Sequence, residues 1–437
     1  MENKVNYRTF KIISLGCKVN YYEREYLSSL LKKNGYIEVP DDTKADISII
    51  NSCAVTEEAS RKSRQMIRRT IKENPSELCI VMGCLSQIDP KIKDIPGVSI
   101  VLGTPKKAKV LDLIKEYEEK NEKIDFVNHE KYSIFKEDYD NYTVDRFEAH
   151  TRAFMKVEDG CNVFCTYCII PYARGKVRSK PLESCIKEAK DLVNSGHKEI
   201  IISGIHTGAY GLDLGITMYD LLKELEKIDG LLRIRISSIE INQITDEIID
   251  LVKNSKKIVH HFHIPIQSGS ERILKLMNRH YTKEEFLSKV KLIRDNIEDV
   301  SLTTDYIVGF PTESDEDFAE VLDTLNKINF DMIHTFPFSK REGTPAAKMP
   351  QVDPKVKQER ARLVRELSTK GYNDLVNRNI GKTVDVIFET YENGYIYGHS
   401  STYIYIKAKG EISQLNKLLY VKILKNEKDA ALAEITQ

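Results

Sequence analysis

One pattern occurs twice along the 437 residues of this chain and most limits its possible folds. Short runs of β-branched residues alternate with amphipathic stretches of helical length. Neighbouring parallel strands need a long crossover connection, usually a helix, so the pattern predicts parallel sheets covered by helices. A chain of this length exceeds what one ordinary core holds, and we therefore expect an α/β protein with more than one domain.

The first series covers residues 1–118 and predicts an open, doubly wound N-terminal domain. Its strands are expected at Thr9–Leu15, Asp46–Ile50, Leu78–Met82 and Val98–Leu102. Between them, Tyr21–Asn34 and Glu57–Glu73 have the pattern of amphipathic helices, and they end near Gly35 and Pro75 as helices tend to.

Residues 119–147 are polar, charged and unperiodic, which predicts a solvated linker. A second series follows over residues 148–372 and predicts a partial, TIM-like (βα)6 barrel. Its strands are expected near residues 152–157, 198–202, 231–237, 258–264, 300–308 and 331–337. A long charged helix is expected over Pro354–Val376. The stretch Lys355–Lys382 contains eight Lys or Arg residues against three acidic ones, which makes a local positive stripe.

The pattern changes again beyond Gly381. Short alternating runs such as TYIYIKA and LLYVKILKN are joined by Asn-Gly and Gly turns, which is typical of β-hairpins. Residues 373–437 are therefore expected to form a small antiparallel β-barrel.

Composition excludes some classes of partner. Lys and Arg total 66 and so do Asp and Glu, so only a local basic patch would bind nucleic acid. No apolar run approaches the roughly 20 residues of a membrane-spanning helix, and the N-terminus lacks the apolar stretch of a secretory signal. We expect a cytoplasmic protein with no membrane partner, in a reducing compartment where the eight cysteines form no disulfides.

Cys161, Cys165 and Cys168 form a CxxxCxxC triplet at the carboxyl end of the first expected barrel strand, where the active sites of αβ barrels lie. Three thiolates on one loop can bind three irons of a [4Fe-4S] cluster and leave the fourth iron open to a substrate, which favours catalysis. One alternative is a zinc site, but structural zinc normally has four ligands and paired CxxC motifs. The other is a chance run of buried thiols.

A second trio is formed by Cys17 in SLGCKVN, Cys53 in IINSCAVT and Cys84 in IVMGCLS, each of which follows an expected strand. Parallel strands present their carboxyl ends at one edge of a sheet, so we expect these sulfurs to converge on a second [4Fe-4S] cluster. Three unrelated buried thiols are the alternative. Cys79 and Cys185 lie inside an expected strand and an expected helix, and we interpret them as packing thiols.

The triplet resembles that of the radical S-adenosylmethionine (SAM) superfamily, whose members bind this cofactor at the open iron and cleave it to a 5′-deoxyadenosyl radical. The resemblance implies cofactor contacts at later strand ends: Ser203, Gly204 and Ile205 at the methionine amine, Glu240 at the ribose and Ile307 at the adenine. Each position is also explained as an ordinary strand end or core residue.

The motifs GCKVN, NSCAVT, MGCLSQ, EDGCNVFCTYCIIPYARG, HIPIQSGS and DYIVGFPTE extend over nearly the whole chain and resemble those of the methylthiotransferase family. GCKVN and PYARGKVRS most resemble the members that modify N6-threonylcarbamoyladenosine in tRNA. The resemblance implies that a sulfur and a methyl group are added to carbon 2 of this base, just 3′ of the anticodon. It also implies that residues 373–437 form a TRAM domain, which binds RNA.

The implied chemistry explains why two clusters are needed. An aromatic C–H bond of this kind is not activated, so a cofactor must supply a carbon radical. The resemblance implies that the barrel trio cleaves SAM while the first trio holds the inserted sulfur, and that each product consumes two SAM molecules. An electron donor such as a flavodoxin or ferredoxin is expected as a partner, whereas the sulfur source is not indicated.

Two basic segments are candidate contacts to tRNA. The expected helix Glu57–Glu73 and the segment after the triplet carry the candidate residues, which are Arg61, Arg64, Arg68, Arg174, Lys176 and Arg178. An ordinary solvated face is the alternative for each of them. Tyr395, Tyr397, Tyr403 and Tyr405 are candidates for stacking on unpaired bases, with core packing as the alternative.

Three histidines lie together in HHFHIPIQSGS. Strand alternation places His260 on the opposite face from His261 and His263, so we interpret them as packed side chains rather than metal ligands.

Three other functions stay open at this point. The same chemistry on isopentenyl-adenosine in tRNA, or on an aspartate of a ribosomal protein, would use the same two-cluster layout. A non-catalytic, redox-sensing iron-sulfur protein that binds RNA would not need SAM at all.

Overall fold

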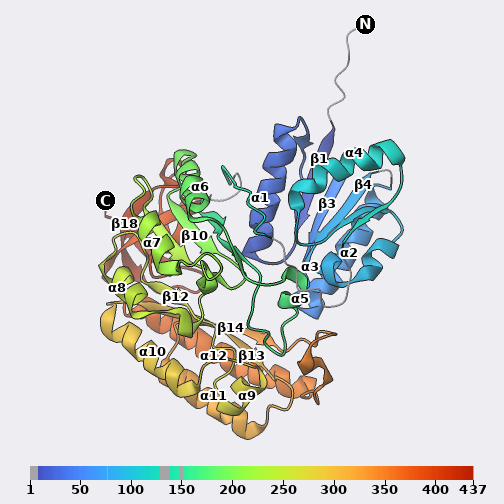
Figure 1. The fold of residues 1–437 in the computed structure, drawn as a ribbon. Coiled ribbons are helices and arrows are strands. Elements are labelled where there is room, and N and C mark those ends of the chain that lie inside the picture. The colour runs from blue at the N-terminus through green and yellow to red at the C-terminus, as the bar shows by residue number, and fades with distance from the viewer. Residues whose placement is uncertain (1–7, 76, 128–137, 148–150, 437) are drawn as a thin grey trace.

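The computed structural model describes residues 8–75, 77–127, 138–147 and 151–436. Three parts follow one another along the chain (Figure 1). The N-terminal sheet with its helices, in blue and cyan, lies on the right of the view. The larger central part, in green to orange, lies to the left and below it, and the C-terminal strands, in red, lie at the far left.

The N-terminal domain is a doubly wound sheet in which all neighbouring strands are parallel. Across the sheet the strands are β2 (Ile37–Glu38), β1 (Thr9–Ser14), β3 (Ile47–Ser52), β4 (Leu78–Gly83), β5 (Val98–Leu102) and β6 (Ile124–Phe126). The helices are α1 (Lys18–Lys33), α2 (Glu57–Glu73), α3 (Cys84–Ile88) and α4 (Val110–Lys120). The four expected strands and both expected helices are confirmed.

Helices cover both faces of this sheet, which explains why its central strands are almost wholly apolar. In β3, Ile49 packs with Leu27 of α1, whereas its neighbour Ile50 packs with Ile67 of α2 on the other face. Because β1 lies between β2 and β3, the chain adds strands first on one side of β1 and then on the other. Ligands of open αβ sheets bind at such a switch point, beside the carboxyl ends of the strands.

The segment expected as a solvated linker contributes to both neighbouring domains. Its residues 124–126 form β6 at the sheet edge, and Tyr142, Val144 and Phe147 are buried. Tyr142 stacks on Tyr26 of α1 with ring centroids 4.0 Å apart. The expectation of a solvated linker is wrong for these residues, because single aromatic residues among charged ones give no periodic signal. The expected domain boundaries themselves remain predictions.

The central domain is a curved parallel sheet whose strands follow one another in chain order. They are β7 (Ala153–Lys156), β10 (Glu199–Ser203), β11 (Arg233–Ile236), β12 (His261–His263), β13 (Ser301–Val308) and β14 (Met332–Pro337). A parallel bridge between Ile234 and Ile258 joins the first three strands to the last three. The partial barrel with six expected strands is thus confirmed within the described residues.

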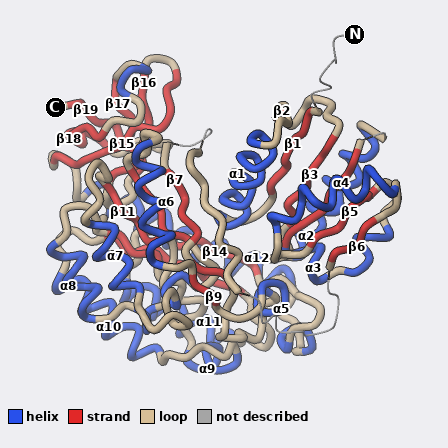
Figure 2. Tube along the Cα trace, turned by 45° about the horizontal axis from the view of Figure 1, so that its top comes forward, coloured by secondary structure: helices blue, strands red, loops and turns tan. Residues whose placement is uncertain are grey.

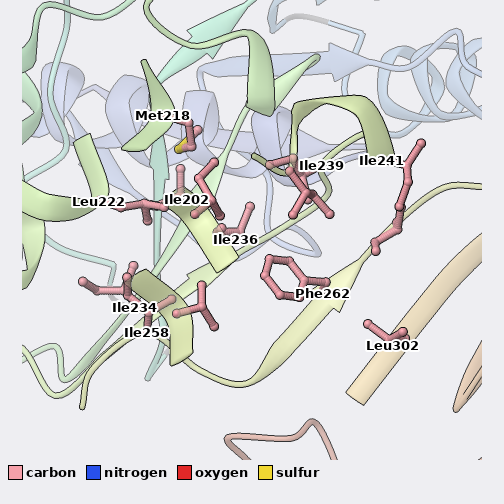
Figure 3. Close-up of a cluster of buried hydrophobic side chains, with 14 of the residues drawn as sticks. Ile202, Met218, Leu222, Ile234, Ile236, Ile239, Ile241, Ile258, Phe262 and Leu302 are labelled. Carbon is pink, nitrogen blue, oxygen red and sulfur yellow. The ribbon is translucent and has the colours of Figure 1, made fainter. Parts of the chain in front are cut away.

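Helices cover the outer face of the partial barrel. They are α6 (Leu182–Asn194), α7 (Met218–Glu226), α8 (Asp246–Asn254), α9 (Glu271–Leu276), α10 (Lys283–Asn296), α11 (Asp315–Ile328) and α12 (Pro354–Asn377). Strand alternation sends Ile202 and Ile234 outward, where they pack with Met218 and Leu222 of α7 (Figure 3). The opposite, inner face carries polar side chains such as that of Arg235.

Residues 383–435 form a closed five-stranded barrel, which lies at the upper left of Figure 2. Its strands are β15 (Thr383–Glu392), β16 (Tyr395–Ser400), β17 (Tyr405–Lys409), β19 (Ala431–Ile435) and β18 (Leu418–Lys425), in spatial order. The expected barrel is confirmed, but β17 and β19 are parallel. In the barrel, β19 lies between β17 and β18. It runs parallel to β17 and antiparallel to β18.

The C-terminal barrel docks on the inner face of β10 and β11 through buried arginines. Arg233 forms an ion pair with Asp385 at 2.6 Å, and Arg235 donates a hydrogen bond to the carbonyl of Ser400 at 3.1 Å. Glu199 of β10 pairs with Arg235 at 2.8 Å. Among the described residues, no helix combines the length and apolar character needed to span a membrane.

Candidate active site

The CxxxCxxC triplet lies on a loop whose backbone is held by a later part of the barrel. The short elements that flank this loop are β8 (Glu158–Asp159), its antiparallel partner β9 (Arg178–Ser179), and helix α5 (Ile170–Arg174). The amide of Thr166 donates to the carbonyl of Met277 at 3.0 Å, and Nδ2 of Asn278 donates to the carbonyl of Val163 at 3.1 Å. These contacts keep the triplet at the carboxyl ends of the barrel strands.

The thiols of the triplet lie close enough together to influence one another's ionisation. Burial raises the pKa of Cys161, and raises that of Cys168 to about 12; nearby sulfurs of the triplet add to both increases. Nη1 of Arg279 lies 3.3 Å from Sγ of Cys165. Burial therefore disfavours free thiolates here, whereas metal binding displaces thiol protons and the guanidinium of Arg279 would stabilise the thiolate of Cys165.

Cys17, Cys53 and Cys84 meet at the switch point of the N-terminal sheet. They follow β1, β3 and β4, and a Cβ atom on Gly16 (φ +106°) would lie only 2.7 Å from Sγ of Cys53. Glycine at position 16 therefore permits both the turn and the close approach of the first loop to the second. Burial raises the pKa of Cys84 to about 11 against the lowering effect of Arg174, and the sulfurs of Cys53 and Cys17 add to the increase.

Arg174, the last residue of α5, connects the two trios. Its Nε lies 3.3 Å from Sγ of Cys84, and its Nη2 donates to Oδ1 of Asn20 at 3.0 Å. Cys84 is also near enough to Cys168 to contribute to the raised pKa of that thiol. The two groups of cysteines thus face each other across α5, which lies between the N-terminal domain and the barrel in Figure 1.

A buried network of charges joins the domains behind the cysteines. Glu23 of α1, which is fully buried, pairs with Arg174 at 3.0 Å and with Lys107 at 3.1 Å. Asp159 accepts from Lys156 at 2.6 Å and from Arg174 at 3.0 Å. Burial alone would raise the pKa of Glu23, but these cations lower it to about 2. Arg178 lies 3.7 Å from Asp159, so four cations surround the two carboxylates, and the guanidinium of one of them, Arg174, lies beside Cys84.

Each trio fits a [4Fe-4S] cluster better than a single metal ion. In the described parts of the chain, no three His, Cys, Asp or Glu side chains are arranged to hold one ion, which disfavours the zinc alternative. Cysteine sulfurs that bind different irons of a [4Fe-4S] cluster lie farther apart than sulfurs that bind the same metal ion. In each trio one sulfur, that of Cys84 or Cys165, has an arginine nitrogen at 3.3 Å. Such a cation offsets the negative charge that thiolates bring.

The segment Ser203, Gly204 and Ile205 packs against Glu158. Oε2 of Glu158 accepts from the amide of His206 at 2.7 Å, and a Cβ on Gly204 would lie 2.7 Å from the same oxygen. Oε1 of Glu158 is buried and has no hydrogen-bond partner among the described residues. An unpartnered carboxylate oxygen favours an ammonium group, so this corner fits the amine of SAM that the resemblance implies.

Glu240 and Ile307 also lie around the triplet. Glu240 pairs with Nη2 of Arg279 at 2.9 Å, so one guanidinium connects this carboxylate with Cys165. Ile307 belongs to the same apolar cluster as Tyr167 of the cysteine loop. These positions agree with a cofactor bound beside the triplet, and their contacts with SAM remain predictions. Our sequence reasoning missed Arg279, which follows a helix without any motif that marks it.

A cavity of about 640 Å³ opens beside Cys17 and is lined by all three domains. The N-terminal domain contributes Cys17 and Lys18, the partial barrel contributes Gly204 and Asp305, and the C-terminal barrel contributes Tyr403. Gly204 connects this cavity with the segment expected to contact SAM. A substrate in this cavity would lie beside Cys17 and beside the segment expected to contact SAM.

Two of the three histidines line this cavity. His261 Nε2 and His263 Nδ1 lie 3.1 and 2.9 Å from Oγ1 of Thr303, whereas His260 is on the opposite face of β12, as expected from strand alternation. Tyr403 stacks on His261 with ring centroids 4.8 Å apart. The interpretation as packed side chains did not anticipate that His261 and His263 face a cavity, because only the curvature of the sheet creates it.

The other candidate tyrosines lie outside the core of the C-terminal barrel. Tyr395, Tyr397 and Tyr405 are half-buried, and the rings of Tyr397 and Tyr405 stack with centroids 6.0 Å apart. Their neighbour in sequence, Ile396, fills the core instead. Stacking on bases remains a prediction for these outer-face rings.

The structure corrects two of the candidate RNA contacts. Arg174 is fully buried and bound by the network behind the cysteines, and Arg178 is 9% exposed and donates to the carbonyl of Arg174 at 2.9 Å. Neither side chain can meet a phosphate, so the prediction is wrong for both. Lys176, between them, is exposed.

Arg61, Arg64 and Arg68 line a groove of about 1010 Å³ between α2 and the end of β14. Arg61 pairs with Glu58 and Arg64 with Asp89, while Lys340 and Lys357 add positive charge on the facing wall. Phe336, 47% exposed, lines both this groove and the cavity beside Cys17. The groove and the cavity therefore adjoin at Phe336, and the RNA contacts of the groove remain predictions.

Comparisons with known proteins agree with this organisation. A family model described as the radical SAM superfamily matches residues 155–325, and another, described as uncharacterized protein family UPF0004, matches residues 9–103. A solved structure of the radical SAM methyltransferase TsrM from Kitasatospora setae, with cobalamin and a [4Fe-4S] cluster bound, is similar with a TM-score of 0.61. It covers 78% of this chain and 77% of that chain at 13% identity, so the similarity concerns the fold alone.

Curated relatives match nearly the whole chain. Threonylcarbamoyladenosine tRNA methylthiotransferase MtaB from Bacillus subtilis is 42% identical, covering 94% of this chain and 93% of its own length. The protein of the same name from Aquifex aeolicus is 38% identical, with coverages of 93% and 98%. The tRNA-2-methylthio-N(6)-dimethylallyladenosine synthase of Caldicellulosiruptor saccharolyticus is 36% identical, with coverages of 98% and 92%.

Fold and site together define a radical SAM enzyme with a second cysteine-lined centre. The chain belongs to the tRNA methylthiotransferase family, and within it resembles the MtaB members. It is therefore an enzyme whose cofactors are SAM and two [4Fe-4S] clusters.

Proposed function

We propose that this chain adds a methylthio group to carbon 2 of N6-threonylcarbamoyladenosine, next to the anticodon of tRNA, in the cytoplasm. The observation that carries the proposal is the arrangement of the two cysteine trios, which face each other across α5. The cavity beside Cys17 also reaches Gly204, in the segment expected to contact SAM. The threonylcarbamoyl substrate is supported by the MtaB relatives at 38–42% identity, compared with 36% for a relative that acts on dimethylallyladenosine.

The cysteines divide into two roles in this proposal. Cys161, Cys165 and Cys168 would hold the cluster that binds SAM, and Cys17, Cys53 and Cys84 would hold the cluster that donates sulfur. When bound, the first cluster and SAM supply the carbon radical that an unactivated C–H bond requires.

The surrounding residues bind and orient rather than exchange protons with the base. Oε1 of Glu158, which has no partner among the described residues, would accept a hydrogen bond from the methionine ammonium. Glu240, held by Arg279 at 2.9 Å, would contact the ribose. Arg174 and Arg279 place positive charge beside one sulfur of each trio. A flavodoxin or ferredoxin supplies the electron that SAM cleavage needs.

The groove along α2 provides the path for the RNA. Its arginines neutralise phosphates, which supplies affinity without reading the sequence of the RNA. Phe336, at the junction of groove and cavity, is placed to stack on a base as the modified nucleoside leaves the strand. Tyr403 closes the far side of the cavity from the C-terminal barrel.

Nucleoside mass spectrometry of tRNA from a strain that lacks this chain tests the proposal. We expect 2-methylthio-N6-threonylcarbamoyladenosine to disappear while its precursor without the methylthio group accumulates. Loss of the isopentenyl counterpart instead would transfer the assignment to that substrate, and loss of a methylthio-aspartate in a ribosomal protein would transfer it to that protein. Purified enzyme that releases no 5′-deoxyadenosine from SAM would indicate a redox sensor.

A further inference from the structure

The cavity beside Cys17 contains a lysine, Lys18, whose side chain has no hydrogen-bond or ion-pair partner among the residues that the structure describes. Lys18 is the first residue of α1, directly after Cys17, and it is exposed toward the cavity that it lines. In the part of the chain that the structure describes, its Nζ forms no hydrogen bond and no ion pair. Because Cys17 caps the N-terminus of α1, the backbone of Lys18 is held directly beside this cysteine.

The other cations of the cavity have partners. Arg152 pairs with Glu389 at 2.9 Å, and Arg235 pairs with Glu199 at 2.8 Å and donates to two carbonyls of the C-terminal barrel.

The carboxylate of Asp305 also lines the cavity, but it is bound by His263. Nε2 of His263 lies 3.2 Å from Oδ2 of Asp305. Lys18, Arg152 and Arg235 line the cavity against the single carboxylate of Asp305, so the lining is positive overall. Lys18 is the one of these cations without a described partner, and an anionic group is what its position favours.

We propose that the ammonium of Lys18 binds the carboxylate of the threonine moiety on the substrate base, and thereby selects it over bases with neutral N6 substituents. This inference rests on the proposed function and deepens it. N6-threonylcarbamoyladenosine carries a free carboxylate at the end of its substituent, whereas an isopentenyl group carries no charge. An ammonium that a neutral substrate leaves without a partner costs binding energy, so one residue both attracts the acid and rejects the hydrocarbon.

The position of Lys18 also serves the reaction geometry. In adenine, carbon 2 and the N6 substituent lie on the same edge of the ring, on either side of N1. A group that holds the substituent next to Cys17 consequently presents carbon 2 to the same end of the cavity. Cys17 is one of the proposed ligands of the sulfur-donating cluster, so Lys18 would position the reacting carbon as well as select the substrate.

The test uses the full enzyme with both clusters and two anticodon stem-loop RNAs. One RNA carries the threonylcarbamoyl group as the free acid, and the other carries its methyl ester. Wild-type enzyme is expected to prefer the acid by roughly 100-fold in kcat/KM, as a hydrogen bond to a charged group permits. Lys18→Gln is expected to lose most of this preference, because conversion of the acid falls while conversion of the ester stays similar.

Controls separate recognition from damage to the clusters. Lys291→Gln, on the outer helix α10, is expected to retain the wild-type preference. Iron content and release of 5′-deoxyadenosine without RNA should match wild type in Lys18→Gln. Lys18→Gln could lose a cluster and then say nothing about recognition. In that case two measurements test the inference: the acid preference of Lys18→Arg, which keeps the charge, and the acid preference of the wild-type enzyme.

Two results would overturn the inference while leaving the proposed function intact. One is a wild-type enzyme that converts ester and acid equally well. The other is a Lys18→Gln enzyme that is impaired equally on both, which would place Lys18 at a phosphate or at the cofactor. A wild-type enzyme that converts neither RNA but converts an isopentenyl-adenosine RNA would refute the proposed function, and the role of Lys18 with it.

Discussion

Nε of Arg174 lies 3.3 Å from Sγ of Cys84, although the two residues belong to different domains and are separated by 90 positions in the chain. The same guanidinium binds Glu23 of α1 and Asp159 of β8. One buried side chain thus connects the barrel, the N-terminal sheet and a proposed cluster ligand. The arrangement of the two centres depends on a contact between domains as much as on either domain.

Arg174→Met should uncouple the domains. Removing this cation leaves Glu23 with the lysines, and Asp159 with Lys156 and the more distant Arg178. Breaking a buried ion pair in this way costs about 3–5 kcal/mol. We expect a lower thermal midpoint and loss of the methylthiolated product. Arg178→Met is the matched control, because Arg178 lies 3.7 Å from Asp159 and makes a weaker contact. Equal midpoints for Arg174→Met and wild type would contradict the proposed role of the network.

Cys84→Ala should remove one cluster and spare the other. Wild-type protein reconstituted without oxygen is expected to contain about eight irons, and Cys84→Ala about four. Release of 5′-deoxyadenosine should continue, because the barrel triplet is intact, whereas methylthiolation should stop. Cys79→Ala provides the control, since Cys79 is fully buried in β4 within the apolar core and should not affect the iron content. Full product formation by Cys84→Ala would exclude it as a ligand.

The ion pairs that dock the C-terminal barrel predict a pH dependence. Burial would raise the pKa of Glu199, but Arg235, Arg233 and Arg152 lower it from 4.5 to about 2. A lowered pKa stabilises the folded state above pH 4.5, by about 3 kcal/mol, and this contribution is lost as the pH falls toward 2. Glu199→Gln should therefore be less stable than wild type at pH 7.

Thermal midpoints of wild type and Glu199→Gln at pH 7, 4.5 and 3 measure this effect. The difference between the two proteins should be greatest at the two higher pH values and smaller at pH 3. Acid damage to the clusters affects both proteins and cancels in the difference. A gap that stays constant across this range would show that the charge of Glu199 does not stabilise the docked barrel.

Arg68→Ala should weaken tRNA binding in a salt-dependent manner. If Arg68 contacts one phosphate, its removal should reduce the slope of log affinity against log salt by roughly 0.7 to 0.9. Arg69→Ala, on the same helix, is the control, because Arg69 pairs with Glu73 at 2.7 Å and lines a separate groove. Equal slopes for Arg68→Ala and wild type would remove Arg68 from the RNA path.

Phe336→Ala should impair the entry of the base rather than the cleavage of SAM. Loss of one stacking platform is expected to lower kcat/KM for tRNA by roughly tenfold, since stacking on an aromatic side chain contributes about 1–3 kcal/mol per base. Release of 5′-deoxyadenosine without tRNA should be unchanged. Phe126→Ala is the control, because Phe126 is comparably exposed at 43% but lies on the edge strand β6. An unimpaired Phe336→Ala would place the RNA elsewhere.

The cysteine trios were predictable from the sequence because strand ends are local features. Cys17, Cys53 and Cys84 each follow a short apolar run, and parallel topology then brings such positions to one edge. The alternation of strand-like and helix-like segments, which occurs twice along the chain, predicted the two sheets for the same reason, since each strand and helix has its own periodicity. The predictions that failed for Arg174 and Arg178 depended on contacts that only the folded chain shows.

Arg174 illustrates that failure. In sequence it belongs to a basic stretch, ARGKVR, that resembles a phosphate-binding segment. Its partners Glu23, Asn20 and Cys84 come from distant elements, so only the folded chain shows that the side chain is buried. Lys18 is the opposite case: it lies in the motif GCKVN, which indicates the family, and the sequence gives no sign that its charge faces a cavity. Nothing local indicates that a cavity forms in front of it.

The length of helix α5 sets the spacing between the two centres. Cys168 lies just before this five-residue helix, Ile170–Arg174, and its last side chain meets Cys84. Each residue turns an α-helix by about 100°, so inserting or deleting one would swing the guanidinium away from its partners in the other domain. The stretch from Cys168 to Arg174 should thus tolerate substitutions far better than insertions or deletions.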